Sequence, residues 1–246
     1  MNLYEEKALI ELRAWQIKMT RQPSFLSGMA KGIQRKMNEL IPEKIHRVLT
    51  TAIKNMVHAT LVGSQFTTGS LVPEGMGLDE REKLVEDKLG FYKKAAAAEG
   101  AGTGAGGFFL GLADFPLLLT LKIKFLFETA NLYGYDVRDI KERIFILYLF
   151  QLAFSSSKRR REVYYDILHW EKTIKKYPLD TKLASFDWRQ FQQEYRDHID
   201  LIKLFQLLPG IGAAVGAYAN YTLLDSLGET AKNGYRLRHF KDKSIM

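Results

Sequence analysis

Apolar residues recur every three to four positions along most of the chain, which is the spacing of one face of an α-helix. Near the start, Ala8, Leu12, Trp15 and Met19 follow this spacing, and Pro23 ends the helix that they predict. No stretch sustains the alternation of apolar and polar residues that a half-buried strand would show. The pattern therefore predicts an all-α protein of about eight to ten helices.

Residues that form turns and caps divide the rest of the chain. Ser24, Asp136 and Asp187 stand where a polar side chain can cap the start of a helix. The apolar run 144–154 is too short to span a bilayer, so we expect a buried helix there. Helices are predicted over 24–40, 43–66, 78–98, 116–133, from Asp136 to about 154, from about 158 to 176, from Asp187, and over 209–231.

Two apolar segments, 100–121 and 204–224, are unusually rich in glycine. Glycine costs a water-exposed helix about 1 kcal/mol relative to alanine, so clustered glycines need a reason. Small residues four apart let helices approach closely, an arrangement favoured in lipid. Three interpretations remain open: close packing in a core with a flexible hairpin, reversible lipid contact, and membrane insertion. Insertion is weakened by Asp114, a charged residue in the first segment. The spaced pairs are Gly102/Gly106, Gly107/Gly111 and Gly212/Gly216.

The two segments also share an order of residues that suggests an internal duplication. Each continues from glycines to Ala-Asp or Ala-Asn and an aliphatic run, and each closes with Glu-Thr-Ala and Gly-Tyr. Chance agreement is the alternative. In a duplicated pair, Asp114 and Asn220 would meet near the centre. We expect one domain over 1–246, with amphipathic helices in 1–98, glycine-rich units at 99–135 and 204–235, and a basic tail at 236–246.

Few residues suggest catalysis or a cofactor. The spacing Gly102-x-Gly104-x-x-Gly107 matches a dinucleotide fingerprint, but a helix and no strand precedes it, and the chain has no P-loop. The pairs Glu43/His46 and Asp166/His169 lack the partner glutamates of a di-iron bundle. We therefore expect no cofactor, no metal site and no assigned catalytic residue.

Asp114 is the one polar residue that deserves a functional hypothesis. It lies in apolar sequence, where burial would raise its pKa and suit it to act as an acid or to contact a ligand. The alternative is structural, because a carboxylate just before Pro116 can cap the start of the following helix.

The net charge of +8 lies mainly at the two ends of the chain, with a further basic run at Lys158, Arg159, Arg160 and Arg161. Such a run attracts anionic headgroups by about 1 kcal/mol per basic residue. It could also contact nucleic acid phosphates or form a solvated helix start. The absence of cysteine fits a reducing cytosol, and residues 1–20 lack a secretory hydrophobic region, so we expect a cytoplasmic protein.

At several of these segments the chain resembles the EcsC family. The resemblance lies in NLYEEKALIELRAWQ (2–16), IPEKIHRVLTTAIKNMVHATLVGS (41–64), GAGTGAGGFFLGLADFPLLLTLKI (100–123) and LLPGIGAAVGAYANYTLLDSLGETA (207–231). It implies a helical cytoplasmic protein of Gram-positive bacteria, encoded beside the ATPase and membrane subunits of an ABC exporter. The resemblance supplies no catalytic residues.

These observations together predict a non-enzymatic accessory protein, peripheral at the inner face of the plasma membrane. Membrane lipid or ABC transporter subunits are the expected partners, and nucleic acid is not. The glycine pairs above, with Asp114 and Asn220, are the expected lipid or partner contacts, and the run 158–161 is the expected headgroup contact. The alternative is a hydrolase that uses a buried Asp114 in an apolar pocket.

Overall fold

The computed structural model describes residues 1–21, 43–62, 75–104, 108–177 and 213–243. These residues form eight α-helices and one 3-10 turn, with no β-strand among them, which confirms the predicted all-α class. The helices are α1 (Leu3–Thr20), α3 (Glu43–Val62), α4 (Leu78–Gly104), α5 (Phe108–Leu132), α6 (Ile140–Phe154), α7 (Ser157–Leu168), α8 (Trp170–Thr173) and α11 (Ala213–Asp242), and the 3-10 turn is Ile174–Lys176. The helices predicted over 24–40 and from Asp187 lie outside the described residues.

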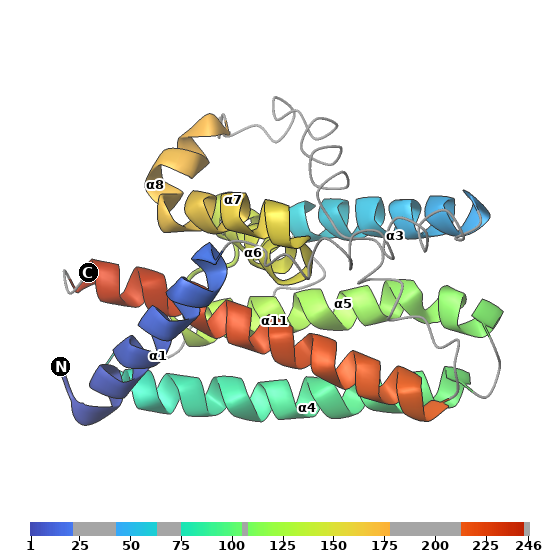
Figure 1. Cartoon of the computed structure of the whole chain (residues 1–246), viewed down its shortest axis with the longest axis horizontal. Coiled ribbons are helices and arrows are strands. Elements are labelled where there is room, and N and C mark those ends of the chain that lie inside the picture. The colour runs from blue at the N-terminus through green and yellow to red at the C-terminus, as the bar shows by residue number, and fades with distance from the viewer. Residues whose placement is uncertain (22–42, 63–74, 105–107, 178–212, 244–246) are drawn as a thin grey trace.

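The helices pack in two layers. Helices α4, α5 and α11 contact one another along one side of the molecule, and α3, α6 and α7 lie over them (Figure 1). Helix α1 crosses the end where both termini lie, and it contacts α4, α7 and α11. This arrangement buries α4, α5 and α11 against each other while α1 keeps one side free.

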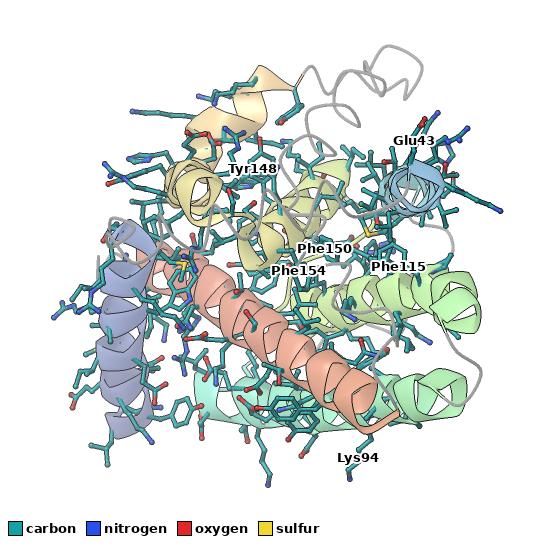
Figure 2. All side chains as sticks on the ribbon, turned by 45° about the vertical axis from the view of Figure 1, so that its right-hand side comes forward. Glu43, Lys94, Phe115, Tyr148, Phe150 and Phe154 are labelled. Carbon is teal, nitrogen blue, oxygen red and sulfur yellow. The ribbon has the colours of Figure 1, made fainter. Side chains whose placement is uncertain are left out.

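Helix α6 packs against α3 and α7 of its own layer and against α5 and α11 of the other, as its unbroken apolar run predicts. A helix that is apolar all round has no side suited to water. Figure 2 shows Phe150 and Phe154 of α6 and Phe115 of α5 in the interior, and all three are fully buried. The rings of Phe150 and Phe154 pack with their centroids 4.6 Å apart. The predicted buried helix at 144–154 is confirmed.

Two predicted N-caps are wrong. Asp139, not Asp136, caps α6, and its side chain accepts a hydrogen bond from the Lys141 backbone N–H. Asp136 instead accepts from the Arg138 backbone in the preceding turn. Asp114 is not a cap either, because α5 starts at Phe108 and includes both Asp114 and Pro116. Proline lacks the N–H for one helical bond, and burial of the apolar residues that follow it offsets that loss.

Three helix ends also differ from the prediction. Helix α4 continues beyond Gly100 to Gly104, and the helix expected to reach Lys176 breaks at His169. Helix α11 extends to Asp242, so the expected basic tail is largely helical. Leu237 and Phe240 lie buried in this last part of α11, and their packing explains why the helix continues. The predicted stop after α5 is correct, since Gly134 takes a φ of 89° that favours glycine.

Two glycines in helices offer a matched test of this packing. Gly234 of α11 faces buried Leu149 of α6, and a Cβ there would clash with the Leu149 Cδ2. Gly90 of α4 faces open space. We expect Gly234→Ala to lower the free energy of unfolding by about 1–3 kcal/mol through overpacking. Gly90→Ala should instead raise it by about 0.5–1 kcal/mol through helix propensity. Urea unfolding of both variants measures the two changes, and equal effects would contradict the close approach of α11 to α6.

Candidate functional site

The most exposed apolar side chains of α1 lie along one side of the helix. Leu3, Ile10 and Ile17 are 84%, 68% and 59% exposed. Residues seven apart fall almost in line on an α-helix, so the three form one stripe. The opposite side of α1 carries Leu12 and Trp15, which are buried against the rest of the protein. We call Leu3, Ile10 and Ile17 the outer face of α1.

Basic side chains flank the outer face. Lys7, Arg13 and Arg21 are exposed and stand three or four residues from a member of the stripe. Among the described residues Arg13 and Arg21 form no ion pair. Glu11 and Lys18, in contrast, pair with Arg236 and Glu229 of α11 at 2.9 and 2.8 Å. Lys7 also lies 4.0 Å from Glu11, so among the described residues Arg13 and Arg21 are the unpaired cations of this segment and Glu6 is its unpaired exposed acid.

A buried ion pair fixes α1 to the body of the protein. Glu82 of α4 accepts two hydrogen bonds of 2.6 Å from Arg236 of α11, and both side chains are almost fully buried. The hydroxyls of Tyr4 and Tyr133 also donate to Glu82, at 2.7 and 2.8 Å. Burial alone would raise the pKa of Glu82, but the Arg236 guanidinium holds it below its usual value. Since Arg236 also donates to Glu11, the pair joins α1, α4, α11 and the turn that follows α5.

A second buried set joins the two chain ends. Glu5 of α1 pairs with Lys243 and, at 3.4 Å, with His239. The Lys243 ammonium, with the Asn2 backbone and His239, lowers the pKa of Glu5 to about 2. Trp15 packs edge-on against Tyr164 of α7, with ring centroids 5.7 Å apart. These contacts hold α1 in place while Leu3, Ile10 and Ile17 of the outer face stay exposed.

The predicted headgroup contact lies at the start of α7, the helix that Trp15 touches. Arg159 pairs with Glu162, and the guanidinium of Arg161 lies 5.9 Å from the centre of the Tyr165 ring. Arg160 is half-buried, and the side chain of Lys158 lies outside the described residues. The run is therefore partly neutralised by its own helix, and its contact with lipid stays a prediction.

Sequence reasoning missed a buried lysine in α5. Lys122 is fully buried, and its Nζ has no hydrogen-bond partner among the described residues. Burial lowers the pKa of its ammonium to about 7. A signal exists in the sequence, because Lys122 falls four residues after Leu118 and four before Leu126, both of them core residues. A cation in that register is uncommon without a partner.

Of the residues predicted to contact lipid or a partner, Asn220 is the one whose side chain is described. It is fully buried in α11, where its Nδ2 donates a long 3.4 Å hydrogen bond to the Ala96 carbonyl and its Oδ1 has no partner. Gly102, Gly111, Asp114 and Gly216 have a helical backbone, but their surroundings lie outside the description. Gly106, Gly107 and Gly212 lie outside the described residues altogether. The predicted glycine contacts and the meeting of Asp114 with Asn220 therefore stay predictions.

Two kinds of site are absent from the described residues. No helix there is both long and apolar enough to cross a membrane. No cluster of three or more histidine, aspartate and glutamate side chains in those residues could hold a metal ion. The described part thus provides an exposed apolar and basic helix face and an unpaired buried lysine as its candidate sites.

Comparison with known proteins gives a consistent result. Residues 6–240 match the model of the EcsC protein family. The chain is 50% identical over 232 residues to "Protein EcsC" of Bacillus subtilis (strain 168), covering 94% of each protein. It is 34% identical over 149 residues to "Uncharacterized protein YdbA" of the same organism, which covers 61% of this chain and 54% of that protein. No solved structure matches the chain.

Proposed function

Since the chain belongs to the EcsC protein family, we propose that it is a non-enzymatic accessory protein that binds the cytoplasmic face of a bacterial membrane through the outer face of α1. The observation that carries the proposal is the exposed line of Leu3, Ile10 and Ile17 beside Arg13 and Arg21, which form no ion pair with a described residue. A helix with apolar residues on one side and basic residues beside them can lie in the headgroup region with its apolar side inserted by about 5–10 Å.

The energies fit reversible binding. Fully burying one leucine or isoleucine side chain contributes about 1.5–3 kcal/mol, and three such side chains lie on the outer face. Each basic residue near an anionic surface adds about 1 kcal/mol. Part of this is lost to the ordering of the protein on the surface. The sum supports a peripheral contact that needs both the apolar stripe and anionic lipid.

This proposal places the membrane contact on α1, whereas the sequence pointed to the glycine-rich segments. Leu3, Ile10 and Ile17 are exposed, whereas the surroundings of the glycine pairs lie outside the described residues. The membrane subunits of an ABC exporter are a second proposed partner, which the family resemblance leads us to expect. No observation on a described residue favours the hydrolase alternative with Asp114.

Vesicle flotation tests the proposal. We expect the protein to float with vesicles that contain an anionic lipid at low salt, and to float less at high salt, since salt screens the arginines. The triple variant Leu3→Ser, Ile10→Ser, Ile17→Ser should lose at least about 30-fold in apparent affinity. Each side chain is exposed, so the fold should survive, and circular dichroism checks this.

A matched control removes exposed apolar side chains from another helix. Leu84 and Phe91 of α4 are also exposed, and the double variant Leu84→Ser, Phe91→Ser should bind vesicles like the unaltered protein. Equal binding by the triple variant and the unaltered protein would overturn the proposal. Absence of flotation under every condition would overturn it as well.

A further inference from the structure

Lys122 and Asn220 lie in the same layer of the α4–α5–α11 unit. The rings of Tyr92 in α4 and Phe125 in α5 pack with centroids 5.9 Å apart. Because α4 runs antiparallel to α5, the next turn of α4 at Ala96 lies opposite the preceding turn of α5 at Lys122. The hydrogen bond from Asn220 to the Ala96 carbonyl places α11 in that layer too.

Both polar groups in this layer lack a partner that they need. Within the described part of the chain, the Lys122 Nζ has no acceptor and the Asn220 Oδ1 has no donor. No ion pair among the described residues includes Lys122. The nearby core positions Leu118, Ala96 and Leu224 are buried and apolar, so they cannot satisfy either group. Buried polar atoms without partners are few in native proteins, and two in one layer call for an explanation.

We propose that this layer binds the oxyanion head of a single-chain amphiphile, with the Lys122 ammonium as the counter-ion. A carboxylate or phosphate accepts hydrogen bonds from Nζ, which satisfies the lysine. A phosphate monoester that keeps one protonated oxygen also donates to the Asn220 Oδ1, whereas a carboxylate only accepts from Lys122. The apolar neighbours favour an acyl chain on that head over an inorganic ion, because ligand sites are mostly apolar with a few placed polar groups.

The charge of the layer supports an anionic head. Lys122 lies near the middle of α5 and Asn220 in the first third of α11, and no acidic side chain among the described residues pairs with Lys122. Burial lowers the pKa of Lys122, and a bound anion would offset that effect by stabilising the ammonium.

Equilibrium dialysis with dodecanoate, dodecyl phosphate and uncharged dodecanol, each kept below its micelle concentration, tests the proposal. We expect saturable binding of one anionic ligand per chain. Its affinity should be at least about tenfold higher than that of dodecanol. The carboxylate and phosphate arms show which head is preferred. The variant Lys122→Met should weaken anionic binding by at least about tenfold. Lys124→Met, two residues away on the same helix and only half-buried, should leave it unchanged.

Each outcome decides the matter. Saturable binding that depends on Lys122 and not on Lys124 supports the site, and Asn220→Leu should then weaken it as well. No saturable binding of either anion would overturn the proposal, as would equal binding by Lys122→Met. The fold is not at risk, because methionine suits an apolar core. The site does not depend on the outer face of α1, so vesicle flotation of Lys122→Met should match that of the unaltered protein.

Discussion

Replacing Arg236 with methionine is expected to lower the free energy of unfolding by about 3–5 kcal/mol. The substitution leaves Glu82 as a buried carboxylate without its counter-ion, and both side chains are almost fully buried. The Tyr4 and Tyr133 hydroxyls would still donate to Glu82, but neutral donors cannot replace the guanidinium. Because Arg236 also pairs with Glu11, α1 should loosen first. Urea unfolding followed by circular dichroism measures the loss.

Two comparisons make this prediction specific. Glu11→Gln removes an exposed partner of the same arginine and should cost less than about 1 kcal/mol. The double variant Glu82→Leu, Arg236→Met removes both charges and should recover part of the loss, because two apolar residues can replace a buried ion pair. A loss below about 1 kcal/mol in Arg236→Met would contradict the buried pair.

Replacing Lys122 with methionine should have the opposite sign and raise the free energy of unfolding by about 2–4 kcal/mol at pH 7. An unfolded lysine has a pKa near 10.4, while burial lowers that of Lys122 to about 7. At pH 7 the folded protein therefore either loses the proton or buries the charge, and both cost free energy. A residue that destabilises the fold in this way is typical of a functional position.

The dependence on pH separates this effect from simple packing. Between about pH 7 and 10 the unfolded chain holds the Lys122 proton and the folded chain does not, so stability rises with pH. The advantage of Lys122→Met should therefore be largest at pH 7 and shrink toward pH 10. Unfolding curves of both proteins at pH 7, 8.5 and 10 measure the difference. A constant difference would contradict the lowered pKa.

The sequence predicted helix type well and several helix ends poorly, for a physical reason. Helix type follows from local periodicity, which the run 144–154 shows clearly. The end of α11 depends on partners far away in the chain, such as Glu82 for Arg236 and Glu5 for Lys243. A cluster of basic residues therefore suggested a tail where the fold has a packed helix. The start of α5 was missed because Pro116 normally marks a helix beginning, and here it lies inside one.

The candidate sites were harder to find than the fold. Helix α1 carries apolar residues on both sides, and only packing decides that Leu12 and Trp15 are buried while Ile10 and Ile17 are exposed. Lys122 was missed, although its spacing from Leu118 and Leu126 is that of a core position, and its lack of a partner among the described residues depends on how the helices pack. Asn220 was singled out from the glycine-rich pattern, and the structure adds its burial and its unsatisfied oxygen.

The central claim, that the outer face of α1 meets the membrane, is tested most directly by a fluorophore on that face. The chain has no cysteine, so Ile10→Cys takes a polarity-sensitive label at a single position. Phe91→Cys, at an exposed site on α4 that is 63% accessible, serves as the control. On adding anionic vesicles, the label at position 10 should brighten and shift to the blue, while the label at position 91 stays unchanged. A shift at position 91 without one at position 10 would contradict the account.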